Sequence, residues 1–343
     1  MVLVKGRNLR LECFGVSRSC DRNSAPAHVH VLPPAFKGTL DQYITSRSKW
    51  CISRQRNWGL PIPVFFCKET KKPFLDKDYI EFISQRIIEK DGSDFWWHES
   101  DSNLVPDRFL KKWDRSITNL ERGRDIFDVW FDSGTSWNHL IPDQVADIYL
   151  EGPDQFRGWF SSSLLLSVAI RNKSPFKNLV VHGFVVDSKG NKMSKSVGNV
   201  ISIEDVLEKS HGQVDILRSW VAHSSLNQKC NISMNMIEKY TETYKSLLNK
   251  FRFICALTSE VDFEDDPCIS KLFNLIYNGH KTEPCDPLAI SSLDQVFINK
   301  LSDIIERALR ENLPEFRYQI VLNDLIELME AFSSIYLSAV KDV

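Results

Sequence analysis

Residues 179–200 read LVVHGFVVDSKGNKMSKSVGNV, and this stretch decides how the rest of the chain is interpreted. The apolar, β-branched run Leu179–Val186 predicts a buried parallel strand. A helical pattern begins after it, from Ile203 to Lys209. A buried strand, a loop and a helix in this order predict an open α/β sheet, in which ligands bind at the carboxyl ends of the strands.

The loop that follows the predicted strand carries two lysines. Lys192 and Lys195 lie three positions apart among hydroxyl side chains, and Gly190 and Gly198 flank them and let the backbone bend. Two ammonium groups on a flexible loop suit a polyphosphate ligand. We therefore predict a phosphate-binding loop here.

Composition sets broad limits. The 343 residues are 43% hydrophobic and 26% charged, as in ordinary globular proteins, and allow two or three domains. The formal charge of -2 neither supports nor excludes a nucleic-acid partner. Eight cysteines without a C-x-x-C pair are interpreted as free thiols in a reducing compartment, and no metal site, zinc included, is expected. No apolar run approaches the ~18 residues of a membrane helix, so we expect no membrane association.

Residues 1–39 differ in composition from the rest and are predicted to be an atypical, disordered N-terminus. They are basic and poor in acids, which is also the pattern of a transit sequence. Both interpretations stay open at this point.

Residues 40–124 are interpreted as a connector and a small α/β insertion. Arg54 and Arg56 lie between Trp50 and Trp58, an arrangement suited to a nucleic-acid end or a phosphate, or to a packed connector with solvated arginines. The periodicity of 79–89 predicts a helix, and the aromatic run at 95–97 is expected to belong to a core.

Residues 125–212 supply one half of a nucleotide-binding sheet. Strands are predicted at 125–134 and 147–152, and a helix begins at Asp154. Strand, helix and strand ahead of the lysine loop form a right-handed βαβ unit. Residues 213–343 are helical by period, with a loose link at about 261–287, and predict a helical bundle. The fold class is therefore α/β followed by all-α.

Polar residues follow the strand at 147–152. Glu151, Gly152, Asp154 and Gln155 lie where a parallel sheet would let a carboxylate pair with a ligand ammonium and accept from a ribose. The alternative is a helix N-terminus that Asp154 simply caps. Spacing alone does not choose between them.

Three further side chains are candidates for the same site. Trp130 and Trp159 would wall an aliphatic pocket, although tryptophans are more often core residues. His182, followed by Gly183, leads into the lysine loop and is equally consistent with a satisfied core histidine.

The sequence resembles class I aminoacyl-tRNA synthetases, and within them the isoleucyl-tRNA synthetases of the bacterial and mitochondrial type. Lys192–Ser196 matches the KMSKS signature of that class. More specific blocks occur in the family's order from about Leu40 onward: WCISRQRNWGLPIPVF, DVWFDSG, YLEGPDQFRGWFSSSLL, HGFVVDSKGNKMSKSVGNV and DILRSWVA. Valyl and leucyl enzymes share the lysine loop and are the alternatives within the class.

The resemblance implies a Rossmann-like sheet and the activation of isoleucine by ATP with Mg²⁺, followed by transfer to its tRNA. Lys192 and Lys195 would be catalytic, because their ammonium groups would neutralise negative charge on the triphosphate. Trp130 and Trp159 would hold the branched side chain, and Arg54 and Arg56 would lie near the tRNA acceptor end. The residues implied to bind ATP or the adenylate are Glu151, Gly152, Asp154, Gln155, His182, Gly183, Met193, Ser194 and Ser196.

The resemblance also has gaps. The family's His-x-Gly-His motif does not occur in these 343 residues, and residues 40–124 correspond only to the downstream edge of an editing insertion. Residues 125–212 then correspond to the second catalytic half, and 213–343 to a stem-contact region and part of an anticodon-binding domain. We expect activity only with a complementary N-terminal half. We place the protein in the mitochondrial matrix, with the cytoplasm as the alternative.

Two other functional classes remain as alternatives. One is a non-catalytic, synthetase-like protein that binds tRNA through its helices. The other is a different nucleotide-dependent transferase, which the order of the five blocks disfavours.

Overall fold

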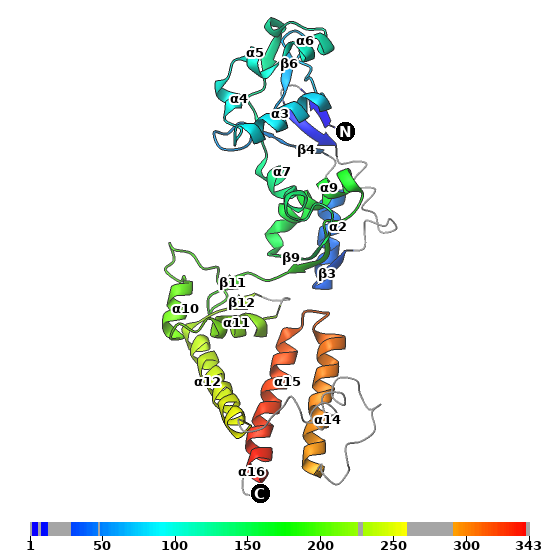
Figure 1. Cartoon of the computed structure of the whole chain (residues 1–343). Coiled ribbons are helices and arrows are strands. Elements are labelled where there is room, and N and C mark those ends of the chain that lie inside the picture. Colours follow the sequence, from blue (N-terminus) through cyan, green and yellow to red (C-terminus); the bar gives the residue numbers. More distant parts are fainter. Residues whose placement is uncertain are drawn as a thin grey trace, which may run out of the picture. The chain divides into compact units, whose positions relative to one another are not determined.

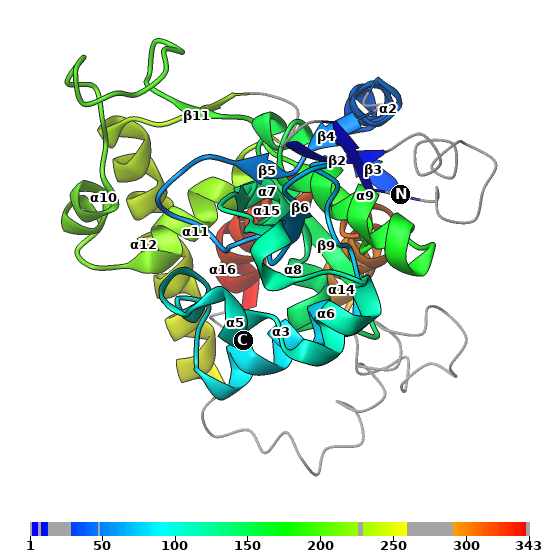
Figure 2. The same ribbon diagram turned by 90° about the horizontal axis from the view of Figure 1, so that it is seen from above.

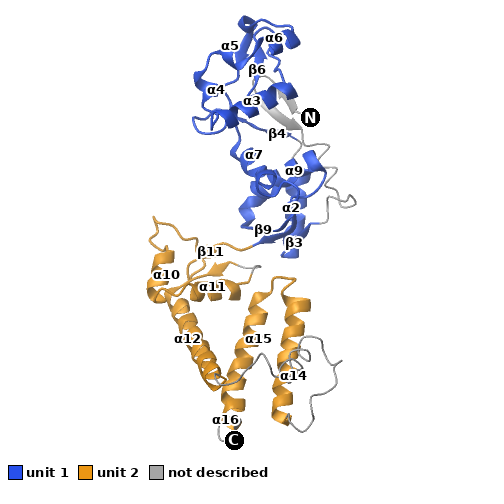
Figure 3. Cartoon of the chain, in the orientation of Figure 1, with its two compact units in different colours: residues 1–181 blue, residues 182–343 orange. Residues whose placement is uncertain are grey.

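The structure is a computed structural model that describes residues 2–5, 8–12, 29–46, 49–225, 229–258 and 291–340. The chain forms two compact units, residues 1–181 and 182–343 (Figure 3). This division falls inside the segment 125–212, which the sequence treats as one piece. Each unit is described by itself below.

A three-stranded parallel sheet carries the main core of unit 1 (Figure 1). Its order is β3 (His30–Leu32), β10 (Phe176–Val181) and β9 (Ala146–Glu151), and both pairings are parallel. α9 (Trp159–Arg171) connects β9 to β10. The predicted α/β class and the strand at 147–152 are therefore confirmed.

Two features of this sheet differ from the sequence prediction: where β10 ends, and the presence of β3 in a segment predicted to be disordered. The run Leu179–Val186 is not one strand, because β10 ends at Val181 and β11 (Val185–Val186) pairs with β12 (Cys230–Asn231) instead. The described part of residues 1–39 is also not disordered: 2–5 and 8–12 are strands, and 29–39 contain β3, η2 (Pro34–Phe36) and the start of α2 (Lys37–Thr45). Residues 13–28 lie outside the described part of the chain.

The main core lies on one face of the sheet. Leu179 pairs in register with Val31 and Tyr149, and all three are buried with the inner face of α9. α2 packs on α9 and adds Leu40 and Ile44 to the same core. On the other face, β9 leaves Ile148 44% and Leu150 55% exposed.

The predicted strand at 125–134 is short and becomes helical. β8 (Ile126–Phe127) pairs antiparallel with β5 (Ser53–Arg54), and α7 (Val129–Gly134) follows directly. The change occurs at Asp128, whose side chain accepts from the Trp130 backbone N–H and caps the helix. α8 (Ser136–Leu140) comes next, and both helices pack on α9.

A second core lies in a small lobe of unit 1. The predicted helix at 79–89 is confirmed as α3 (Lys77–Glu89), which starts earlier because Asp76 caps it. Trp96 and Phe95 are buried against α3, as expected for core residues, whereas Trp97 is partly exposed. The lobe's other elements are β6 (Phe65–Cys67), α4 (Phe95–His98), α5 (Asp101–Leu104), α6 (Asp107–Trp113), η3 (Ile117–Asn119) and β7 (Leu120–Arg122). A further antiparallel sheet joins β1 (Val2–Lys5), β2 (Asn8–Glu12) and β4 (Lys49–Cys51).

Unit 2 opens with the lysine loop and continues in helices. The predicted helices are present as α10 (Ile203–Lys209), α11 (Val214–His223) and α12 (Met234–Leu257). Val206, Ile216, Trp220 and Ile237 form their common core. Figure 2 shows the segment after β11 as a long hairpin that projects away from these helices.

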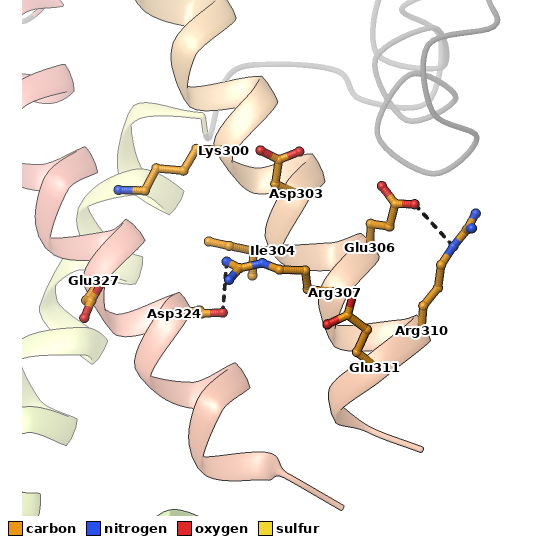
Figure 4. Close-up of a pocket in the computed structure, with 9 residues that line it drawn as sticks. All are labelled: Lys300, Asp303, Ile304, Glu306, Arg307, Arg310, Glu311, Asp324 and Glu327. Carbon is orange, nitrogen blue, oxygen red and sulfur yellow. Dashed lines mark ion pairs between the residues drawn. The ribbon is translucent and has the colours of Figure 1, made fainter. Parts of the chain in front are cut away.

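The remaining helices are α14 (Ser292–Arg307), η5 (Ala308–Asn312), α15 (Tyr318–Ala331), η6 (Phe332–Tyr336) and α16 (Leu337–Val340). The link at about 261–287 lies outside the described residues. A charged groove between α14 and α15 is bridged by Arg307 Nη2 and Asp324 Oδ2 at 3.1 Å (Figure 4). Its five carboxylates outnumber its three cations, so it does not suit a polyphosphate.

Candidate functional site

The polar residues after β9 form a short turn at the carboxyl end of the sheet. Glu151 is the exposed last residue of the strand, and its Oε2 accepts from the Gly152 N–H at 3.3 Å. Gly152 is buried, and η4 (Pro153–Phe156) follows it. The Glu151 carboxylate therefore faces solvent at the edge where open α/β sheets bind ligands.

Asp154 and Gln155 lie together in this turn. Gln155 Nε2 donates to Asp154 Oδ2 at 3.0 Å, and Gln155 Oε1 accepts from the Trp159 N–H at 3.3 Å. Gln155, rather than Asp154, therefore satisfies a free N–H at the start of α9. The exposed Asp154 carboxylate keeps an oxygen directed away from that bond.

The structure brings the two tryptophans of the predicted pocket to the start of α9. Trp130 lies against Gly158, where an added Cβ would sit 2.5 Å from Trp130 Cη2. Trp159 is the next residue, and its ring stacks on Tyr149 with centroids 4.0 Å apart and an interplanar angle of 8°. Both indoles are half-buried. Only glycine fits at position 158 without displacing Trp130.

Arg54 and Arg56 have different environments. Arg54 Nη2 donates to Asp128 Oδ2 at 2.6 Å, so its guanidinium is paired with a buried carboxylate, although the Arg54 side chain is itself 37% exposed. Arg56 is exposed, and the neighbouring Trp58 is 93% exposed. The predicted pair therefore divides into one structural arginine and one exposed arginine beside an exposed indole.

Asp132 on α7 is a half-buried carboxylate near Asp128. Burial raises the pKa of Asp132, and the negative charge of Asp128 raises it further. Both causes disfavour the ionised form. α7 thus carries an acid whose neutral form is favoured more than in a solvated aspartate.

The lysine loop of unit 2 is closed at its base by two side chains. Asp187 Oδ1 accepts from the N–H groups of Lys189 at 2.9 Å and Asn191 at 2.8 Å. Asn199 Nδ2 donates to Asp187 Oδ2 at 2.9 Å, and Asn199 Oδ1 accepts from the Ser194 N–H at 2.9 Å. Asp187 and Asn199 therefore fix both ends of the loop.

The loop presents its lysines to solvent and anchors its methionine. Lys192 and Lys195 are exposed, and within the described residues neither forms an ion pair. Met193 packs against the core of α10, α11 and α12. Gly190 and Gly198 adopt φ of +80° and +71°, which glycine tolerates and other residues rarely do. Ser194 Oγ and Ser196 Oγ lie 3.1 Å apart.

His182 and Gly183 form the break between β10 and β11. His182 Nδ1 donates to the Gly183 carbonyl oxygen at 2.9 Å, which places a proton on Nδ1. Both residues are half-buried. These residues lie between β10 and β11, in the run that the sequence presents as one strand.

Sequence reasoning missed the residues that support the site. Gly158, Tyr149, Asp187 and Asn199 were not singled out, and only Asp128 carried a readable signal, as an N-cap residue before a helix.

In the part of the chain that the structure describes, no group of three or more His, Cys, Asp and Glu side chains is placed to hold a metal ion. Among the same residues, no helix has both the length and the apolar character to cross a membrane.

Comparison with known proteins places the chain in a family. Residues 18–233 match the family described as tRNA synthetases class I (I, L, M and V). This match begins upstream of residue 40, where the motifs start. A probable mitochondrial isoleucine–tRNA ligase of Dictyostelium discoideum is 37% identical, over 91% of this chain and 30% of its own length. An isoleucine–tRNA ligase of Campylobacter curvus is 44% identical, over 68% of this chain and 26% of its own length.

Solved structures show the same fold. A Mycobacterium tuberculosis methionyl-tRNA synthetase in complex with methionyl-adenylate has a TM-score of 0.59 at 15% identity, covering 97% of this chain and 52% of its own. An Agrobacterium radiobacter LeuRS in complex with tRNA has a TM-score of 0.54 at 17% identity, covering 87% and 39%. The chain spans about a third or less of the curated relatives' length. Its motifs, its fold and the match over residues 18–233 together show that the chain belongs to the class I tRNA synthetases.

Proposed function

We propose that this chain is part of an isoleucine–tRNA ligase and provides its second catalytic half. The observation that carries this proposal is the pair of indoles, Trp130 and Trp159, held at the start of α9 beside the Glu151–Gln155 turn. Isoleucine–tRNA ligases are also among the similar proteins, at 35–44% identity. An apolar wall next to exposed carboxylates suits an amino acid with a branched aliphatic side chain.

In the proposed reaction, the residues of unit 1 position the amino acid and the adenylate. Glu151 pairs with the α-ammonium group, and Gly152, Asp154 and Gln155 accept or donate at the ribose and neighbouring atoms. Trp130 and Trp159 enclose the side chain. The protein's contribution is to hold the carboxylate of isoleucine for attack on the α-phosphorus of ATP.

The residues of unit 2 act on the phosphates. Lys192 and Lys195 stabilise the charge that develops on the triphosphate, and Met193 anchors the loop that carries them. We assign His182, Gly183, Ser194 and Ser196 to the same nucleotide. Mg²⁺ bound with ATP would supply further charge neutralisation, held through the phosphates rather than by a cluster of protein ligands.

The second step transfers the aminoacyl group to isoleucine tRNA. The exposed Arg56 is our candidate contact for the acceptor end, and Trp58 beside it offers a face on which a single-stranded base can stack. Arg54 is held by Asp128 and has another role, described below. The helices of unit 2 would contact the tRNA further from its acceptor end.

Two parts of the proposal concern context. The chain spans 30% of the length of the mitochondrial relative, so we propose that catalysis needs a complementary half with the His-x-Gly-His motif. The name of that relative and the basic residues before position 40 favour the mitochondrial matrix over the cytoplasm.

Binding of non-hydrolysable aminoacyl-adenylate analogues tests the proposal. The chain, combined with a polypeptide that supplies the His-x-Gly-His half, is titrated with isoleucyl, valyl, leucyl and methionyl analogues. We expect the isoleucyl analogue to bind at least tenfold more tightly than the others. Tighter binding of another analogue would reassign the substrate. If none of the analogues binds but tRNA does, the non-catalytic, tRNA-binding alternative is favoured.

A further inference from the structure

α7 holds both tryptophans of the proposed pocket. Trp130 is its second residue, and Trp159 Nε1 donates to the carbonyl oxygen of Ser133, also on α7, at 3.1 Å. Trp159 Nε1 further lies 3.2 Å from Ser136 Oγ, just after the helix. A shift of α7 therefore moves both indoles.

The start of α7 is fixed by Asp128. Its Oδ1 accepts from the Trp130 N–H at 3.3 Å, and its own N–H donates to the Ile52 carbonyl oxygen at 2.8 Å. Asp128 is only 3% exposed. A buried carboxylate is stable only where donors surround it, so the donors on Asp128 decide where α7 begins.

Two side chains of the connector supply those donors. Trp50 Nε1 donates to Asp128 Oδ2 at 2.8 Å, and Arg54 Nη2 donates to the same oxygen at 2.6 Å. Arg54 Nη1 donates in turn to the carbonyl oxygens of Cys51 at 2.6 Å and Ser53 at 2.9 Å. The planar guanidinium thus ties the connector backbone to Asp128, which the single ammonium of a lysine would not reproduce.

We propose that Arg54 and Trp50 are positioning residues that set the width of the amino-acid pocket through Asp128 and α7. The inference rests on the proposed function for the identity of the amino acid. Isoleucine and valine differ by one methylene group, and a pocket separates such a pair by roughly 10- to 200-fold. A small displacement of α7 is therefore expected to change the selectivity between isoleucine and valine, while KM for ATP stays the same.

Fluorine NMR of the chain labelled with 5-fluorotryptophan tests the structural part. The chain has nine tryptophans, so each resonance is assigned by replacing that residue with Phe. Arg54→Lys is expected to shift or broaden the resonances of both Trp130 and Trp159. Trp50→Phe, which removes one donor and keeps an aromatic ring, is expected to do so to a smaller extent.

Arg86→Lys is the matched control. Arg86 Nη2 forms a comparable ion pair with Glu99 Oε2 at 2.7 Å and Nη1 donates to the Asn103 carbonyl oxygen at 2.9 Å, but both lie in the small lobe. We expect this variant to leave Trp130 and Trp159 unchanged. Unchanged resonances in Arg54→Lys, or equal changes in Arg54→Lys and Arg86→Lys, would overturn the inference.

Selectivity tests the functional part. With the complementary half present, Arg54→Lys is expected to raise KM for isoleucine about tenfold and to narrow the ratio of kcat/KM between isoleucine and valine, with KM for ATP unchanged. Equal changes in both KM values would overturn the positioning role. If the resonances shift as expected but wild type activates no aliphatic amino acid, the proposed function fails and the link from Arg54 to α7 stands.

Discussion

Asn199 donates to Asp187 across the base of the lysine loop, with Nδ2 and Oδ2 2.9 Å apart. The two residues are twelve positions apart, and the bond encloses Lys192 and Lys195. Because Asn199 also accepts from the Ser194 N–H, it orders the backbone on which both lysines are carried. The loop is therefore a closed hairpin rather than a free segment.

Asn199→Ala is expected to loosen this loop. In the chain combined with its complementary half, pyrophosphate exchange should fall roughly fivefold to tenfold, the rate equivalent of one lost hydrogen bond. The affinity for isoleucine should not change, because the amino acid is assigned to unit 1. Ser188→Ala, an exposed neighbour, is the control, and an equal loss in both variants would contradict the role of Asn199.

The same contact predicts a pH dependence. The hydrogen bond from Asn199 lowers the pKa of Asp187, and the Asn191 N–H lowers it further. A lowered carboxyl pKa means that the contribution to stability is complete above the ordinary value of about 3.9 and is lost as pH falls through the lowered value. The protection of the Ser194 amide against hydrogen exchange, measured relative to the intrinsic exchange rate at each pH, should therefore fall only in acid. A loss of this protection between pH 6 and 5 would contradict this assignment.

Lys195→Ala is expected to separate chemistry from binding. The Lys195 ammonium is assigned to charge that develops on the phosphates, so the rate of adenylate formation should fall by about 100-fold or more. Binding of isoleucine should change less than twofold. Lys189→Ala, on the same hairpin, is the control, and a matched loss of rate and affinity in Lys195→Ala would argue against the phosphate role.

Asp132→Asn is expected to stabilise unit 1 at neutral pH. Burial and the charge of Asp128 raise the pKa of Asp132, so the folded state binds a proton more tightly than the unfolded state and stability falls as pH rises through the raised value. The variant should melt roughly 1–3 °C higher than the wild type at pH 7, and the two should melt at the same temperature in acid. Asp114→Asn, at an exposed helix end, should show no such pattern. A gain that persists unchanged in acid would exclude this cause.

The chain alone is expected to be marginally stable and prone to aggregate. Ile148 and Leu150 are half-exposed on β9, an edge strand of the parallel sheet. Ile148→Thr with Leu150→Thr should reduce binding of a hydrophobic dye and delay aggregation. The control pair Ile88→Thr and Ile170→Thr removes exposed isoleucines on helices and should do neither. Equal effects of the two pairs would contradict the importance of the sheet face.

The sequence predicts the local elements well and their interruptions poorly. The strand predicted at 147–152 is observed as β9, the pattern at 203–209 gives α10, and the helical period after residue 213 gives α11 and α12. The prediction of one strand over Leu179–Val186 fails because β10 ends at Val181 and the last two residues of the run pair with β12 instead. The stretch at 125–134 fails because Asp128 caps a helix inside an apolar pattern.

Long-range relationships were beyond sequence reasoning for a physical reason. β3 is three residues long, and its identity as a strand depends on pairing with β10, far along the chain. The candidate residues could be chosen from their types and spacing, but Arg54 could not be told from Arg56, because only the ion pair with Asp128 separates them. The roles of the candidates stay predictions.

The most direct test of the account is isoleucine-dependent exchange of pyrophosphate with ATP by the chain in the presence of a His-x-Gly-His half. We expect exchange with isoleucine, much weaker exchange with valine, and none when either polypeptide is omitted. The Lys195→Ala chain should reduce the exchange to background. If the combined polypeptides show no isoleucine-dependent exchange, the central claim that this chain supplies half of an adenylate-forming site is contradicted.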